Sequence, residues 1–141
     1  MSGFLLDTNC ISELIRSRPE PRVMDWMRAA DESLLYLSAL TLGEIRKGAA
    51  ILPQSKRRTH LESWLELDLP VRFSGRILAI DKVVADRWGW LTAEAERKGR
   101  PLAAIDGLLA ATALEHNLTI VSRNTSDFAY THVPILNPWE S

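Results

Sequence analysis

The sequence predicts an α/β fold in which helices cover both faces of a mostly parallel sheet, that is, three α/β/α layers. Short apolar runs, typical of buried strands, alternate along the chain with longer stretches of helical spacing. Prolines and glycines stand where these helices begin or end. Strands that alternate with helices favour parallel pairing, because parallel strands need a crossover connection. At 141 residues, the chain has the length of one domain, residues 1–141.

The expected strands are short apolar runs bounded by polar residues. They are residues 4–6, 34–37, 77–80, 118–121 and 133–136. No run approaches the ~20 apolar residues of a membrane span, and Asp7 interrupts the first run before a signal-peptide core could form. The lone Cys10 cannot form an intrachain disulfide, so we expect it in the core. These features favour a cytoplasmic protein without membrane contact.

The expected helices have apolar residues at helical spacing. They are residues 9–16, 22–30, 41–52, 56–67, 82–98 and 103–116. Pro19 and Pro53 follow the first and third of these, where a helix cannot continue, and Pro21 precedes the second, where its fixed φ suits a first turn. Gly99 and Asn117 follow the last two and are typical helix ends.

The composition is that of a globular protein, with 46% hydrophobic and 25% charged residues, which excludes a disordered or fibrous chain. The formal net charge is -1, and it becomes +3 if four acids discussed below are set aside. The basic residues gather at 16–22, 46–47, 56–58 and 97–100. A cationic rim around an acidic centre would suit a polyanionic substrate, although each cluster alone is equally typical of a solvated helix face.

Acidic side chains follow three of the expected strands. Asp7 comes directly after the first strand, Glu44 falls in the first turn of the helix after the second, and Asp127 follows the fourth. Ligands of open parallel sheets bind at the carboxyl ends of the strands, so these acids could share a site. Helix capping is the alternative for each: Asp7 as an N-cap, Glu44 in a capping box with Thr41, and Asp127 at a third helical position.

Asp106 is harder to explain by capping. On a helix it shares a stripe with the small residues Ala103, Ala110 and Ala113, which let another backbone come close and enclose the carboxylate. No basic residue occupies the neighbouring helical positions. An enclosed, unpaired carboxylate is costly, so a bound cation is the natural partner.

Four converging carboxylates would repel one another strongly. Two of them about 4 Å apart repel by about 4 kcal/mol at an effective dielectric of about 20. One or two divalent cations would turn this repulsion into attraction, and all-oxygen ligands favour Mg²⁺ or Mn²⁺. Zinc is disfavoured, because His60, His116 and His132 lack ligand spacing. The chain also lacks a glycine-rich phosphate loop and a serine nucleophile elbow.

Four segments in order carry a resemblance to a known family. They are Leu5-Leu6-Asp7-Thr8-Asn9, Glu44 at the head of a helix, Ala104-Ile105-Asp106 followed by Leu109-Ala110-Ala111-Thr112-Ala113, and Ser122-Arg123-Asn124-Thr125-Ser126-Asp127-Phe128. Together they closely resemble the PIN-domain family, and within it the VapC toxins of the FitB-like group, which residues 136–139 also resemble. The resemblance covers essentially the whole chain.

The resemblance implies a three-layer PIN-domain fold and a Mg²⁺- or Mn²⁺-dependent endoribonuclease activity. It further implies a homodimer that is inhibited by a cognate antitoxin protein and contacts DNA only through that antitoxin. RNA is the implied substrate, with a metal-activated water attacking the phosphodiester.

The resemblance also assigns roles to residues. Asp7 and Asp106 are the implied principal metal ligands, Glu44 is a ligand or water-bridged member of the same pocket, and the fourth role falls to Asp127 or Asn124. Thr8, Ser122 and Arg123, with Asn124, are implied to support these ligands or to contact phosphate.

Other functions compete with the nuclease. An apolar strand ending in Asp-Thr also opens the aspartyl-nucleophile phosphatases, but that class needs a second acid at position 9, which is Asn. A receiver-like signalling domain would need paired acids after its first strand and a lysine late in the chain. A third alternative is a catalytically weak PIN protein that acts mainly through its antitoxin on DNA.

The tryptophans Trp26, Trp64, Trp88 and Trp90 fall on expected helices. Core or dimer packing, or a groove for the antitoxin, would account for them. Trp88 and Trp90 are two positions apart and cannot share a helix face, so at least one of them should lie off the core.

Overall fold

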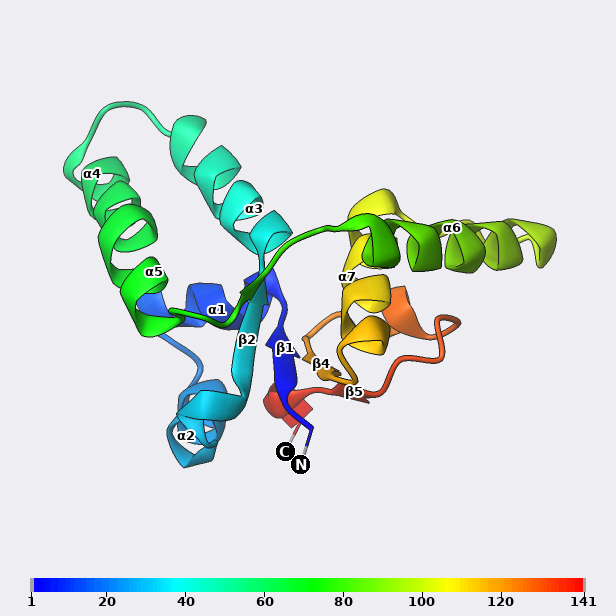
Figure 1. Ribbon diagram of the computed structural model, residues 1–141. Coiled ribbons are helices and arrows are strands. Elements are labelled where there is room, and N and C mark those ends of the chain that lie inside the picture. The colour runs from blue at the N-terminus through cyan, green and yellow to red at the C-terminus, as the bar shows by residue number, and fades with distance from the viewer. Residues whose placement is uncertain (1, 141) are drawn as a thin grey trace.

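The central feature of the fold is a five-stranded parallel sheet with helices on both faces (Figure 1). The computed structural model describes residues 2–140. The strands run in the order β3-β2-β1-β4-β5, and every neighbouring pair is parallel. This confirms the predicted α/β fold. The strands are β1 (Phe4–Leu6), β2 (Leu35–Ser38), β3 (Ile77–Leu78), β4 (Thr119–Val121) and β5 (Ile135–Leu136).

Three of the expected helices agree with the structure to within a residue at each end, namely those over 22–30, 82–98 and 103–116. Pro21 opens the first of these, and Asn117 follows the last with a positive φ of 55°. The α-helices are α1 (Thr8–Ile11), α2 (Pro21–Ala29), α3 (Ala39–Ala50), α4 (Lys56–Ser63), α5 (Leu69–Arg72), α6 (Lys82–Arg97) and α7 (Ala104–Glu115). The 3-10 turns are η1 (Ser12–Ile15), η2 (Glu32–Leu34), η4 (Thr125–Phe128) and η5 (Pro138–Glu140), and η3 (Trp64–Asp68) is a π-helical turn.

The helix expected over 9–16 is in fact broken into α1 and η1. The buried carboxylate of Glu13 explains the tighter second turn. It accepts hydrogen bonds from the backbone N–H of Glu20 at 2.8 Å and from the Arg16 guanidinium at 2.8 Å. These bonds draw the chain away from a continuous helix.

The helix expected over 56–67 runs further, through η3 and α5 to Arg72. In η3 the backbone N–H of Leu69 bonds to the carbonyl of Trp64, five residues back, and this wider turn is followed by Pro70. Trp64, Leu65 and Leu69 are all buried, so core packing outweighs the helix-breaking tendency of the proline.

Two apolar cores lie on the two faces of the sheet. Alternation along β1 sends Leu6 into a core with residues of α1, α2, η3 and α5, while Leu5 packs with residues of α6 and α7. Phe4 extends the first core through an edge-to-face contact with Trp26, whose ring centroid lies 5.1 Å away. Both cores meet at the central strand β1.

Two predictions about individual side chains are confirmed. Cys10 is fully buried, and Trp90 is 68% exposed while Trp88 packs against the α6–α7 core. Within residues 2–140, no helix is both long and apolar enough to cross a membrane.

The topology places a switch point at the carboxyl end of β1. From β1 the chain passes to β2 on one side, and only later to β4 on the other. Such a switch point leaves room above the strand ends for a ligand. Figure 1 shows α3 leading away from this end, whereas both chain termini lie at the opposite end of the sheet.

Candidate active site

Asp7 lies at the carboxyl end of β1 and is only 8% exposed. Its backbone N–H donates to the carbonyl of Val121 at 2.9 Å, which ends the β1–β4 pairing. Its side chain caps α1, because Oδ1 accepts the N–H of Thr8 at 2.8 Å. The capping role considered from sequence is therefore real, yet it uses only one carboxylate oxygen.

The second oxygen of Asp7 belongs to a network that joins the ends of β1 and β4. Ser122 donates its hydroxyl to Asp7 Oδ2 at 2.7 Å and accepts the backbone N–H of Asn124 at 3.0 Å. Asn9 places Nδ2 3.3 Å from Ser122 Oγ and 3.5 Å from Asp7 Oδ2, and its Oδ1 accepts the N–H of Arg123 at 3.3 Å. Ser122 was expected here; Asn9 was missed as a site residue, although its place in Asp7-Thr8-Asn9 was a signal.

Glu44 reaches the site from α3. The helix begins at Ala39, because Ser38 is its N-cap and accepts the N–H of Leu40 at 3.1 Å. The expected capping box with Thr41 is therefore wrong, and Glu44 lies in the second turn rather than the first. There its Oε1 accepts the hydroxyl of Thr8 at 2.6 Å, which ties α3 to α1 beside Asp7.

Asp106 lies in the first turn of α7 and is partly buried. The residue after it explains how α7 comes so close to α6. A Cβ atom at Gly107 would lie 3.0 Å from Trp88 Cδ1 and 3.1 Å from Leu102 Cδ2. Glycine removes this conflict, so the helix carrying Asp106 packs tightly against Trp88.

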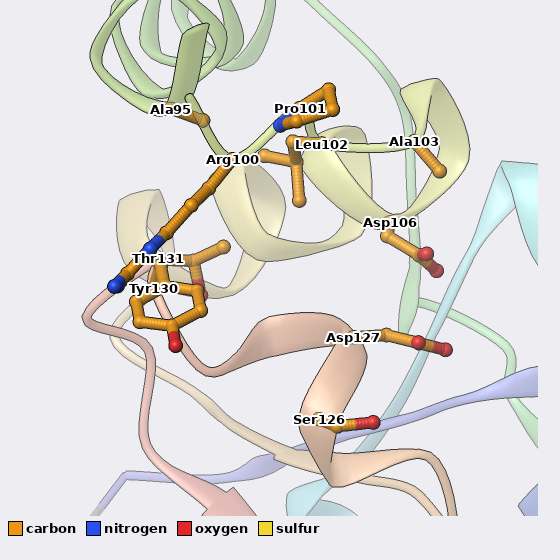
Figure 2. A pocket seen from close by; sticks show the side chains of 10 residues that line it. All are labelled: Ala95, Arg100, Pro101, Leu102, Ala103, Asp106, Ser126, Asp127, Tyr130 and Thr131. Atoms are coloured by element: carbon orange, nitrogen blue, oxygen red, sulfur yellow. The ribbon is translucent and has the colours of Figure 1, made fainter. Parts of the chain in front are cut away.

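Asp127 is the third residue of η4 and is exposed. Figure 2 shows its carboxylate pointing to the same side as that of Asp106, one from η4 and the other from α7. Asn124 precedes η4 at its N-cap position and is also exposed. The structure thus brings the side chain of Asp127 next to Asp106.

The four carboxylates share one electrostatic environment. Burial raises the pKa of Asp106 to about 6, and repulsion from Asp127, Asp7 and Glu44 adds to the rise. Burial also raises the pKa of Asp7, against the hydrogen bonds from Ser122 and Thr8, with Glu44 and Asp127 again adding to the rise. None of the ion pairs formed among residues 2–140 includes any of these four acids.

The donor chemistry of this cluster fits a hard divalent cation. Carboxylates are the ligands that Mg²⁺ and Mn²⁺ prefer, and here they repel one another without a basic partner. Within residues 2–140, however, no three Asp, Glu, His or Cys side chains close around a single point where an ion could be held. The four acids therefore lie in one region of the molecule without forming a complete ligand shell.

Comparison with known families matches residues 4–132 to the PIN domain. The chain belongs to the PIN-domain family. The match spans β1 to the segment after η4, and so includes all four carboxylates.

This PIN domain is similar over nearly its whole length to a toxin and to a ribonuclease. It is 41% identical over 135 residues to Toxin FitB of Neisseria gonorrhoeae, a match that covers 96% of this chain and 97% of that protein. It is 39% identical over 136 residues to VapC ribonuclease Y4jK of Sinorhizobium fredii, with 96% and 97% covered.

Solved structures show the same fold. FitAcB from Neisseria gonorrhoeae matches this PIN domain with a TM-score of 0.92 and 40% identity, covering 98% of this chain and 99% of that one. FitAB bound to a DNA fragment matches with a TM-score of 0.90 and 39% identity, covering 96% and 95%.

Arg123 is the remaining residue that the sequence placed near the site. It is exposed, and its guanidinium carbon lies 5.9 Å from the centroid of the Trp139 ring. Its backbone is held by Asn9, as described above, and by Asn137, whose Nδ2 lies 3.5 Å from the Arg123 carbonyl. The backbone of Arg123 is thus anchored beside Asp7, while its side chain faces solvent.

Proposed function

We propose that this PIN domain is a Mg²⁺- or Mn²⁺-dependent endoribonuclease that acts as the toxin of a toxin-antitoxin pair. The observation that carries the proposal is the convergence of Asp7, Glu44, Asp106 and Asp127 at the switch point of the sheet, where Thr8 joins Glu44 to α1 beside Asp7 and where Asp106 and Asp127 line one pocket. The names of the relatives, a toxin and a ribonuclease, support the same assignment.

Asp7 and Asp106 would hold the principal ion, because they are the two acids whose pKa burial and repulsion raise. Glu44 and Asp127 would complete the site, with Asn124 beside Asp127. A bound divalent ion would neutralise phosphate charge and lower the pKa of a water molecule. The cost of gathering the carboxylates would then be offset by their attraction to the ion.

The remaining side chains would orient the ligands and the substrate. Ser122 donates to Asp7 Oδ2 and the Thr8 hydroxyl donates to Glu44 Oε1, so each of these two acids is held in a fixed orientation. Glu44 would orient the attacking water or accept its proton. Arg123, exposed at the rim, would contact a phosphate of the RNA backbone.

The test is cleavage of a labelled single-stranded RNA by the purified protein with Mg²⁺, with Mn²⁺ and with a chelator. We expect cleavage with either ion, none with chelator, and none by Asp7→Asn. Asparagine retains the N-cap function at position 7, so the variant should fold. Equal cleavage by Asp7→Asn purified in the same way would point to a contaminating nuclease and refute the proposal.

We also propose a cognate antitoxin protein as partner, and contact with DNA only through that protein. The structure of FitAB bound to a DNA fragment supports this arrangement for a relative. Expression of this chain in the bacterial cytoplasm, where we place its RNA substrate, should arrest growth. Co-expression of a small protein encoded next to it should relieve the arrest, whereas arrest by Asp7→Asn would contradict a nuclease toxin.

A homodimer is the proposed assembly. Val83 and Trp90 on α6 are 57% and 68% exposed, and such apolar side chains are typical of interfaces. Sedimentation of the purified chain would show a dimer, and Trp90→Glu should shift it toward the monomer.

A further inference from the structure

A pocket of about 280 Å³ adjoins the acidic cluster. It lies between the end of α6, the start of α7 and the segment that follows η4. Figure 2 shows Asp106 and Asp127 on one side of it, and Arg100 lying against Tyr130 on the other. The carboxylates and the Arg100–Tyr130 pair therefore line one continuous cavity.

The guanidinium of this pair lies over the aromatic ring. Its guanidinium carbon lies 3.9 Å from the Tyr130 ring centroid, and Tyr130 is 56% exposed. Arg100 forms no ion pair with any carboxylate of residues 2–140. Most arginines of the chain do form one, namely Arg16, Arg22, Arg28, Arg46, Arg58, Arg72, Arg76 and Arg87. Arg100 thus keeps its charge and its donors for another partner.

The chemistry of the pair suits a nucleotide. Unstacked RNA bases bind by stacking on tyrosine rings or on arginine guanidinium planes. A guanidinium also offers several donors to phosphate oxygens. A planar base and an anionic phosphate are thus both accommodated next to carboxylates that are proposed to act on a phosphodiester.

We propose that this pocket holds the RNA nucleotide next to the cleaved phosphodiester, with its base stacked on the Arg100–Tyr130 pair and its phosphate contacted by Arg100. The proposal rests on the proposed ribonuclease function. Arg100 and Tyr130 bind substrate and leave the chemical step to the carboxylates. Their loss therefore affects affinity and KM rather than kcat.

The experiment measures binding of a fluorescent, mixed-sequence single-stranded RNA to the full chain in chelator, by anisotropy over a range of salt concentrations. Tyr130→Leu should weaken binding by about 5- to 100-fold, with the salt dependence retained. Arg100→Met should weaken binding and also reduce the slope of log affinity against log salt by about 0.7.

Two variants serve as matched controls. Tyr130→Phe keeps the ring and should bind as the wild type does. Arg28→Met removes an exposed positive charge on α2, outside the basic clusters and the pocket, and it should leave both affinity and slope unchanged.

Cleavage kinetics in Mg²⁺ provide a second readout. Both Tyr130→Leu and Arg100→Met should raise KM and leave kcat near the wild-type value. A pair that only stabilises the fold would instead lower Tm without changing KM, so Tm is measured for every variant.

The outcomes separate this proposal from the proposed function. Wild-type affinity and KM in both pocket variants would overturn the nucleotide site, as would equal losses in Arg28→Met and Arg100→Met. If the protein cleaves no RNA but binds it in a way that depends on Arg100 and Tyr130, the proposed ribonuclease function is refuted and the proposed nucleotide site is supported. A protein that neither binds nor cleaves RNA would overturn both.

Discussion

Asp7 caps α1 with one carboxylate oxygen and receives the Ser122 hydroxyl on the other. The same residue thus fixes local structure and faces the other acids. Asp106 differs, because among residues 2–140 its side chain has no such hydrogen-bonding partner to offset burial, and its pKa rises to about 6. Substitutions at Asp7 and Asp106 should therefore have different effects on stability.

Replacing Asp106 by Asn should abolish RNA cleavage and stabilise the metal-free protein at neutral pH. The pKa of Asp106 is raised from 3.8 to about 6, so the folded state binds this proton more tightly than the unfolded state does. The stability that this group contributes is complete below pH 3.8 and is lost as pH rises through about 6. Removing the charge should add roughly 1 kcal/mol at pH 7.5 after allowance for solvent screening.

Urea unfolding in chelator at pH 7.5 and pH 4.5 would measure this gain, which should be smaller at the lower pH. Asp86→Asn is the matched control, since Asp86 is an exposed acid on α6 outside the cluster. A gain of equal size at both pH values would show that charge relief is not the cause.

In the pH profile of kcat/KM for RNA cleavage, Ser122→Ala should shift the acidic limb to higher pH. In the wild type, kcat/KM should fall as pH drops through about 6, because Asp106 must be ionised to hold a cation. The Ser122 hydroxyl lowers the pKa of Asp7, so its loss lets that pKa rise further. A profile that keeps its shape and only loses amplitude would contradict this positioning role.

Among the elements, α1 and α3 are joined by the hydrogen bond from the Thr8 hydroxyl to Glu44. The placement of Glu44 therefore depends on where α3 begins, and Ser38 sets that point as its N-cap. The close packing of α6 and α7 at Gly107 likewise determines where Asp106 lies. Helix starts, more than helix lengths, position the acids.

Ser38→Ala and Ser55→Ala should destabilise the protein similarly but differ in their effect on cleavage. Each serine is an N-cap, of α3 and α4 respectively, and its loss costs about 1 kcal/mol. Of these two helices, only α3 carries a site residue, Glu44. We therefore expect only Ser38→Ala to lower kcat/KM for RNA cleavage. Thermal unfolding and RNA cleavage of both variants check this, and equal activity losses would argue against a role for the α3 start.

For the whole molecule, the acidic cluster is a source of repulsion that a bound cation would remove. Its members come from α1's N-cap, α3, α7 and η4, so an ion would link segments on both sides of the sheet. Ion binding should therefore be visible in global stability.

Mg²⁺ or Mn²⁺ should raise Tm, with a gain of about 2.7 kcal/mol when the ion exceeds its Kd by 100-fold. Asp7→Asn should lose this gain, because a ligand oxygen and a charge are removed. Glu96→Gln, at an exposed acid of α6, is the control and should respond as the wild type does. Scanning fluorimetry with and without ion measures the shift, and an equal response of all three proteins would indicate nonspecific salt effects.

Sequence alone determined the strand and helix alternation, the parallel sheet and the ends of the helices near Pro21 and Asn117. These follow from burial patterns and backbone restrictions that act between near neighbours. Sequence was less reliable where packing competes with local preference. The helix that continues past Pro70 reflects the packing of buried side chains in the core. The break after Ile11 reflects the hydrogen bonds of the buried Glu13 carboxylate to Arg16 and Glu20.

The site itself was only partly accessible from sequence. Asp7, Glu44 and Asp127 could be named because polar residues at strand ends are a local signal. Asp106 was named from its stripe of small helical neighbours, and Ser122 only from the family resemblance. Only tertiary structure decided that Ser122 holds Asp7, 115 residues away, that Thr8 holds Glu44, and that Arg100 lies on Tyr130 beside the acids. The physical reason is that side-chain contacts between distant segments depend on how helices pack and where they start, to within about an ångström, and no local pattern encodes that distance.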